Sequence, residues 1–178
     1  MRTDRLREEF DLQLRWSVFP LHPETPEEGR ELSDLFAGHM DIDAMRQRLY
    51  RVAEELGLPM GQRSRTYNSR RAQELGKWAE EQGHGEAFHM AVYRAYFVDG
   101  RNIALPAELE TIAAGLGLDA GVARKVIEKG SHAAAVDADW QRAAALGVSA
   151  VPTSIYQERA LVGFQPYAYY RRLINTAD

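Results

Sequence analysis

The sequence contains no cysteine. Structural disulfides, thiolate zinc sites, iron–sulfur clusters and thiol nucleophiles are therefore excluded from this chain. Thiol–disulfide exchange by the chain itself is excluded as well, because that reaction passes through a mixed disulfide with a cysteine of the enzyme. Any activity assigned to these 178 residues has to be one that needs no thiol of their own.

The chain also lacks an excess of basic residues and a long apolar run. Its 22 Lys and Arg residues are outnumbered by 26 Asp and Glu residues, so the formal net charge is −4. A nucleic-acid-binding face needs clustered positive charge, and we expect no nucleic-acid partner. The longest uncharged stretch, residues 143–157, is shorter than the roughly 20 residues of a membrane helix. With no signal-peptide pattern at Met1, we expect a cytoplasmic protein without a membrane partner.

The ends of the chain show strand signals beside helical ones. Residues 3–10 predict the end of a helix, and residues 11–18 alternate apolar and polar side chains, which predicts a strand. Near the C-terminus, residues 153–156 and 160–162 predict a hairpin, and Pro166 suits the first turn of a last helix.

Between these ends, residues 41–130 have helical spacing punctuated by glycines. Further helices are predicted over residues 68–82, 86–98, from Pro106, from Asp119 to Gly130, and from Ser131 to about 146. One apolar stripe precedes Gly57, and we expect it to be buried in a helix bundle. Its members are Met45, Leu49, Val52 and Leu56.

No set of side chains has the spacing of a metal or cofactor site. His84 and His89 are five residues apart, and His84 lies between two glycines in a predicted turn. Asp41 and Asp43 resemble a helix start more than a calcium loop, whose glycine and terminal glutamate are missing. The sequence therefore predicts no metal site and no cofactor.

The sharpest local feature is a proline at the head of a predicted strand, directly after the glycine that ends a helix. Gly147 is followed by Val-Ser-Ala-Val and then by Pro152, Thr153 and the strand. By itself this is a weak signal of a cis bond, since only about one X–Pro bond in twenty is cis in folded proteins. Together with the family resemblance described below, it leads us to expect a cis Val151–Pro152 peptide bond. The order of helix, glycine, proline-headed strand, hairpin and helix is that of the second half of a thioredoxin fold.

Nearly the whole chain resembles the DsbA family of protein disulfide oxidoreductases, in particular its FrnE-like branch. Five segments carry the resemblance: residues 19–28, 66–69, 88–97, 136–153 and 162–167. It implies an α/β, thioredoxin-like (DsbA-type) fold in which residues 1–38 and 131–178 form the thioredoxin-like part. Residues 39–130 form a large inserted helical subdomain. It also implies that an extended peptide or protein thiol substrate binds at four residues: Ala150, Val151, Pro152 and Thr153.

The sequence departs from the family at its start. The first central strand and the Cys-x-x-Cys of the family have no counterpart here, so no catalytic residue can be assigned and the chain is expected to be redox-inactive. We interpret the chain as an N-terminally truncated enzyme rather than one that lost its redox function naturally, because Met1 falls within an expected helix. The missing strand would leave residues 11–18 and 153–156 as unpaired edges, from which we expect a homodimer.

Two other functions stay open. Related glutathione-dependent enzymes, the 2-hydroxychromene-2-carboxylate isomerases and kappa-class transferases, share the helical insertion and use a serine at the position of the first cysteine. The second alternative is a non-catalytic module for peptide binding or assembly.

Overall fold

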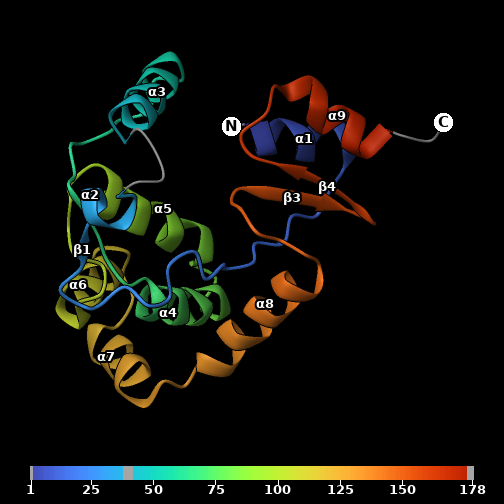
Figure 1. Ribbon diagram of the computed structural model, residues 1–178. Helices are drawn as coiled ribbons and strands as arrows, with labels where there is room; N and C mark the ends of the chain where they lie inside the picture. The colour runs from blue at the N-terminus through green and yellow to red at the C-terminus, as the bar shows by residue number, and fades with distance from the viewer. Residues whose placement is uncertain (1, 38–41, 176–178) are drawn as a thin grey trace. The chain divides into compact units, whose positions relative to one another are not determined.

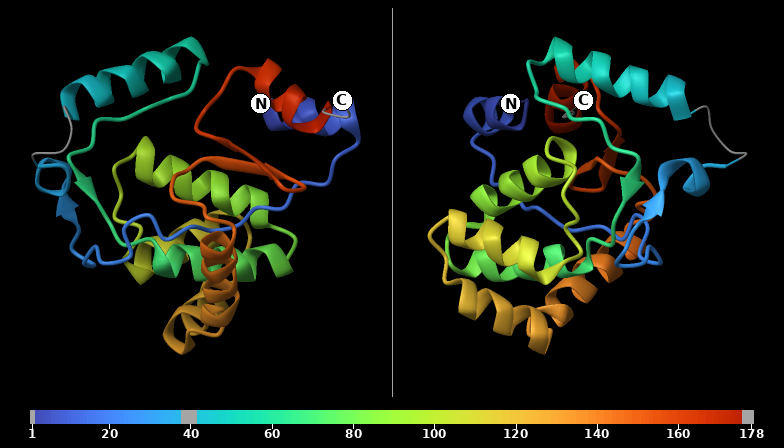
Figure 2. Two further views of the ribbon diagram at one scale, coloured as in Figure 1. Left: turned by 45° about the vertical axis from the view of Figure 1, so that its right-hand side comes forward. Right: turned by 90° about the vertical axis from the view of Figure 1, so that its left-hand side faces the viewer.

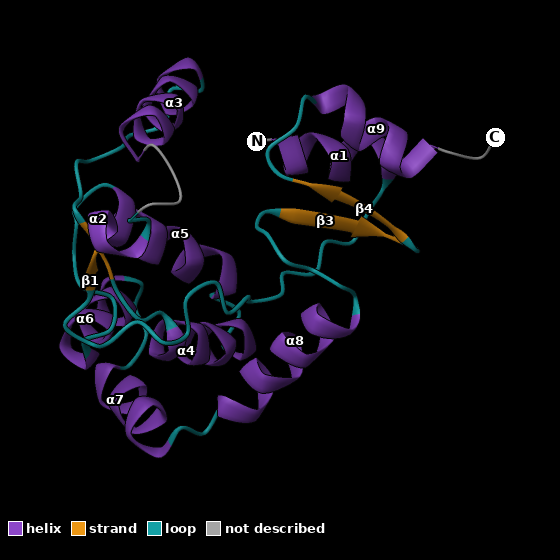
Figure 3. Cartoon of the chain, viewed as in Figure 1, coloured by secondary structure: helices purple, strands orange, loops and turns teal. Residues whose placement is uncertain are grey.

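The computed structural model describes residues 2–37 and 42–175, and within them helices dominate over two short two-stranded sheets (Figure 1, Figure 3). The helices are α1 (Arg2–Phe10), α2 (Leu32–Leu35), α3 (Ile42–Glu55), α4 (Arg70–Glu81), α5 (Gly85–Phe97), α6 (Pro106–Gly115), α7 (Ala120–Lys129), α8 (Ala133–Ala145) and α9 (Tyr167–Asn175). The strands are β1 (Arg30–Glu31), β2 (Arg65–Thr66), β3 (Thr153–Tyr156) and β4 (Arg159–Val162). Both sheets, β1 with β2 and β3 with β4, are antiparallel.

The chain divides into two compact units, Met1–Leu21 with Asp137–Asp178, and His22–Val136. The division expected from the sequence has the same order of pieces but assigns residues 22–38 and 131–136 to the first unit. In the structure, hydrogen bonds tie the first of these two segments to the helical unit. Strand β1 pairs with β2, and Asn68 Nδ2 donates to the carbonyl oxygens of Pro23 and Thr25 at 3.1 and 2.8 Å.

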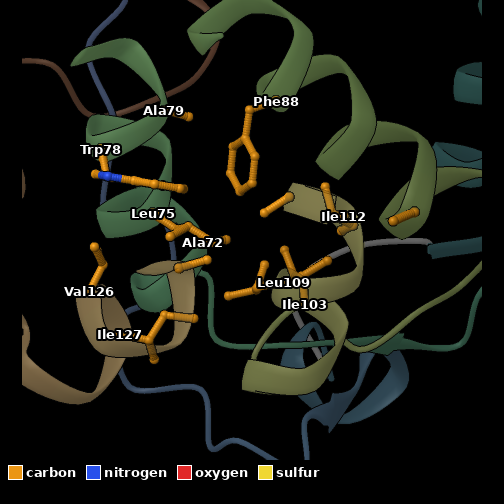
Figure 4. Close-up of a cluster of buried hydrophobic side chains, with 13 residues drawn as sticks. Ala72, Leu75, Trp78, Ala79, Phe88, Ile103, Leu109, Ile112, Val126 and Ile127 are labelled. Atoms are coloured by element: carbon orange, nitrogen blue, oxygen red, sulfur yellow. The ribbon is translucent and has the colours of Figure 1, made fainter. Parts of the chain in front are cut away.

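The main core lies in the second unit, where α4, α5, α6 and α7 pack against one another (Figure 4). On α4, Ala72, Leu75 and Ala79 are spaced three and four residues apart and are all buried. Leu75 and Phe88 are fully buried at the centre. The cluster is completed by Ala72, Trp78, Ala79, Ala95, Ile103, Leu109, Ile112, Ala113, Ala123, Val126 and Ile127. Burial of this apolar surface stabilises the helical unit.

Local signals set the ends of these helices as expected. Pro106 opens α6, where its missing N–H is not needed. Asp119 caps α7, and its side chain accepts a hydrogen bond from Val122 N at 2.9 Å. Gly130 ends α7 in the left-handed conformation that favours glycine, with φ of 56°.

The predicted strand at residues 11–18 is wrong. These residues form no helix or strand, and Trp16 is 55% exposed. A strand needs a partner for its backbone groups, and among the described residues no strand lies beside this segment. The segment is held instead by the side chain of Asp139 in α8.

The prediction that the apolar stripe before Gly57 is buried is also wrong. The helix forms as predicted, but Met45, Leu49 and Leu56 are 37%, 45% and 44% exposed. Helix α3 contacts its own unit through another face, on which Ala53 is buried and Tyr50 donates to the carbonyl oxygen of Gly61 at 3.1 Å.

Gly61 lies where the chain from α3 passes the end of α5. Its N–H donates to the carbonyl oxygen of Phe97 at 2.8 Å. A Cβ at this position would overlap the carbonyl group of Val98. The close approach of two backbones therefore requires glycine here.

The first unit buries fewer apolar side chains within the described residues. Leu6, Ala143 and Tyr170 are buried. At the surface of α1 and α9, Glu9 accepts a hydrogen bond from the hydroxyl of Tyr167 at 2.5 Å and pairs with Arg171 at 2.7 Å.

Candidate functional site

The four residues implied in substrate binding lie between α8 and β3. Gly147 ends α8 with φ of 67°, and the chain then reaches Ala150 and Val151. The Val151–Pro152 peptide bond is cis. Thr153 Oγ1 donates a hydrogen bond to the carbonyl oxygen of Ala150 at 2.6 Å, which closes the bend on itself.

One edge of β3 is paired and the other is free. Thr153 lies opposite Val162 in β4, and Gly163 N donates to the carbonyl oxygen of Pro152 at 2.7 Å. Residues of an antiparallel strand alternate between facing the partner strand and facing away. Because Pro152 faces β4, the backbone groups of Thr153 and Ile155 face away from it. Within the described residues no other strand pairs with this edge.

The free edge is open to solvent next to the bend. Val151 is 46% exposed, and its backbone N–H and C=O have no hydrogen-bond partner within residues 2–37 and 42–175. Ile155, two positions after Thr153, also has an exposed side chain. The edge therefore offers unpaired backbone groups and apolar side chains together, which is what an added strand requires.

This arrangement can bind but carries no reacting group of its own. Residues 150–153 supply one side-chain hydroxyl, that of Thr153, and it is engaged with the carbonyl oxygen of Ala150. None of the four has a thiol, an imidazole or a carboxylate. Within the described residues, the geometry is that of an unpaired strand edge without a group for covalent chemistry.

Asp139 is a structurally important residue that the sequence reasoning missed. It is 2% exposed and accepts hydrogen bonds from Arg15 Nη2 at 3.2 Å and Val18 N at 3.1 Å. The signal was present in its spacing, since Asp139 shares one face of α8 with the buried Val136 and Ala143. A carboxylate within an inward apolar stripe indicates a buried polar contact.

The contact between Arg63 and Tyr96 was not predicted from the sequence. Both residues line a shallow depression of about 200 Å³ together with Gln62, Ser64, Arg65, Tyr67 and Gly100. Arg63 Nη1 donates to the hydroxyl of Tyr96 at 2.6 Å and to the carbonyl oxygen of Arg65 at 3.2 Å. Its guanidinium also lies 4.4 Å from the centre of the Tyr96 ring. Arg63 therefore ties the chain before β2 to α5.

The two histidines considered as metal ligands, His84 and His89, have different surroundings. His84 precedes α5 at its N-cap, and His89 Nε2 lies 3.7 Å from Glu80 Oε1. Asp43 pairs with Arg46, and Asp41 lies outside the described residues. In the part of the chain that the structure describes, no group of three or more such side chains is arranged to hold a metal ion.

The family model of the DSBA-like thioredoxin domain matches residues 1–175. The chain belongs to this family. Its fold is the DsbA-type thioredoxin-like fold, mainly helical with small sheets, and the family recognition from the sequence is confirmed. A comparison with curated protein sequences finds no match.

Solved structures of similar proteins support the fold. A probable DsbA oxidoreductase from Streptomyces coelicolor is 28% identical, with a TM-score of 0.77 over 85% of this chain and 69% of that protein. A 2-hydroxychromene-2-carboxylate isomerase is 19% identical, with a TM-score of 0.72 over 97% of this chain and 83% of the isomerase. A candidate protein disulfide isomerase from Nitrosomonas europaea is 16% identical, with a TM-score of 0.62 over 98% and 87%.

The similar structures include both DsbA oxidoreductases and an isomerase. The specific activity of this DSBA-like domain therefore has to be argued from its own residues. Neither the bend nor the hairpin contains a cysteine, since the chain has none. None of the helices within residues 2–37 and 42–175 combines the length and the apolar character needed to cross a bilayer.

Proposed function

We propose that this DSBA-like domain binds extended polypeptides as the substrate-docking part of protein disulfide oxidoreduction. The observation that carries the proposal is the free edge of β3, with Val151 exposed and the backbone groups of Thr153 and Ile155 facing away from β4. A polypeptide that adds as a strand would satisfy these groups with main-chain hydrogen bonds. Such binding tolerates many sequences, which suits a protein that acts on diverse polypeptide substrates.

The redox step itself lies outside the chemistry of this chain. Exchange requires a thiolate that attacks a disulfide sulfur, and the chain has no thiol. Binding here is therefore non-covalent. The 28% identity to a probable DsbA oxidoreductase, against 19% to the isomerase, supports polypeptide rather than glutathione-dependent chemistry.

The test compares two substitutions at one position. Thr153→Pro removes both the hydroxyl and the N–H that faces the free edge, whereas Thr153→Val removes only the hydroxyl. The probe is a fluorescein-labelled peptide of alternating threonine and valine, and its binding is followed by fluorescence anisotropy. We expect Thr153→Pro to weaken binding by roughly three- to tenfold, the equivalent of one backbone hydrogen bond. Thr153→Val should bind like the parent chain.

Two controls make the result specific. The same peptide methylated on alternate backbone nitrogens should bind weakly to all three proteins, and circular dichroism should show that both variants are folded. Equal binding of the peptide to all three folded proteins would reject the docking edge. Saturable binding of glutathione, with no binding of the peptide, would favour the isomerase-like alternative instead.

A further inference from the structure

Helix α3 exposes an apolar stripe that nothing in the described structure covers. Met45, Leu49 and Leu56 are each more than a third exposed, and Leu58 just beyond the helix is exposed too. The stripe follows the spacing of three and four residues that is typical of a helix packed against a second helix. In the views of Figures 1 and 2, α3 stands apart from helices α4 to α7 of its own unit.

The stripe differs from the face by which α3 is attached. Attachment is through Ala53, which is buried, and through the Tyr50 hydroxyl on the carbonyl oxygen of Gly61. Because successive residues advance by about 100° around a helix, Tyr50 and Ala53 lie to one side of the line through Leu49 and Leu56. A partner can therefore lie along the stripe without displacing α3 from its unit.

The charges beside the stripe select the partner. Arg48 and Glu55 lie along its other side, one near each end of the stripe. Neither forms an ion pair within residues 2–37 and 42–175, whereas Arg46 pairs with Asp43 around the helix. A partner with the opposite order of charges, acidic opposite Arg48 and basic opposite Glu55, would satisfy both.

We propose that two copies of this chain associate through antiparallel α3 helices. A two-fold axis between Tyr50 and Arg51 places Leu49 against the partner's Val52, and Met45 against the partner's Leu56. The same axis brings Arg48 next to the partner's Glu55, twice by symmetry. In a parallel pair, Arg48 and Glu55 would lie on the opposite side of the seam from the same residues of the partner and would not meet, so the charges favour the antiparallel arrangement.

The interface is small, so the dimer depends on concentration. Helix α3 has 14 residues and is about 21 Å long. One such helix pair buries less than the roughly 1,200–2,000 Å² of a standard stable interface. This proposal is separate from the dimer expected from the edges of residues 11–18 and 153–156, of which residues 11–18 form no strand and β3 keeps a free edge among the described residues.

The experiment is sedimentation velocity over protein concentrations from about 1 to about 200 μM, the range in which a small interface associates. The parent chain should shift from monomer to dimer over this range. Leu49→Glu places a carboxylate at the centre of the stripe and should abolish the shift. Gln47→Glu, on the exposed opposite side of the same helix, introduces the same carboxylate without touching the stripe and should leave the dimer intact.

A charge exchange tests the register. Arg48→Glu sets two acidic residues against each other and should weaken the dimer by several-fold. Adding Glu55→Arg in the same chain should restore it, because the pair is then reversed. A parent chain that stays monomeric over the whole concentration range overturns the proposal. The stripe would then bind a different protein or another part of the same chain. A dimer that survives Leu49→Glu overturns the proposal as well.

Discussion

The charge of His89 depends on how α4 and α5 pack. Its Nε2 would lie 3.1 Å from a Cβ added to Gly76, so a larger residue there would crowd the ring. Burial lowers the pKa of His89 below the ordinary value of 6.5. The Glu80 carboxylate raises the pKa of His89, but burial is the larger effect, and the Lys77 ammonium lowers this pKa as well. The folded chain therefore favours the neutral ring.

This shift makes stability depend on pH. Just below pH 6.5 the unfolded chain protonates His89 while the folded chain still resists, so the unfolded state binds more protons. The free energy of unfolding should therefore fall as pH falls through 6.5 and level off below the folded pKa. His89→Gln should lose this component, and urea unfolding of both proteins at about pH 7.5 and about pH 5.5 measures it. Parallel losses in the two proteins would contradict the burial effect.

At the scale of elements, the segment after α1 depends on a side chain rather than on a sheet. Asp139 of α8 accepts hydrogen bonds from Val18 N and from Arg15, and it is itself buried. A buried carboxylate with two donors fixes the path of residues 11–21 along α8. In this segment a buried side-chain anchor stands where the sequence suggested a ladder of backbone hydrogen bonds.

Asp139→Asn should therefore destabilise the protein markedly. The amide nitrogen would face a donor where a carboxylate oxygen now accepts, and the lost contacts should cost about 1–3 kcal/mol. Arg15→Gln removes only an exposed partner and should cost less than about 1 kcal/mol. Urea denaturation of the two variants gives the comparison. A larger loss in Arg15→Gln than in Asp139→Asn would show that the anchor is misplaced.

Elements with signals in their own residues could be predicted from the sequence. Pro106, Asp119 and Gly130 set helix ends through local backbone chemistry, and these ends are where they were expected. The strand at 11–18 and the buried stripe of α3 failed for one shared reason. Alternating or amphipathic spacing shows that one face of a segment is suited to packing. It does not show whether a packing partner is present, because that partner comes from a distant part of the chain.

In the candidate site, too, the local features could be predicted from the sequence and the long-range ones could not. The bend at Pro152 and the hairpin after it follow from local sequence, and residues 150–153 were singled out by family resemblance. The free edge of β3 could not be predicted, because it depends on which strands lie beside it. The role of Asp139 depends likewise on Val18, more than a hundred residues away.

At the scale of the whole molecule, the two units differ in how much apolar surface they bury. The second unit has the large cluster around Leu75 and Phe88. In the described part of the first unit, the buried hydrophobic residues are Leu6, Ala143 and Tyr170. Opening a region costs more free energy where more apolar contacts have to be broken.

Hydrogen exchange should therefore separate the units. We expect amides of α4 to α7 to exchange slowest, at the rate set by global unfolding, and amides of β3, β4 and α9 to exchange faster through local opening. Exchange followed by mass spectrometry of proteolytic fragments resolves these regions. Equal protection in the hairpin and in α4 would mean that the two units open together.

The contact at Gly61 has a consequence for how the gene can change. Every residue except glycine adds a Cβ, and at this position the Cβ would overlap the Val98 carbonyl group. Gly61 also accepts the hydrogen bond from Tyr50 that holds α3, so moving the chain to relieve the overlap would move that helix. Gly61, which carries no functional group, is thereby closed to ordinary substitution, while exposed positions of α3 away from the apolar stripe and its flanking charges, such as Gln47, are free to vary.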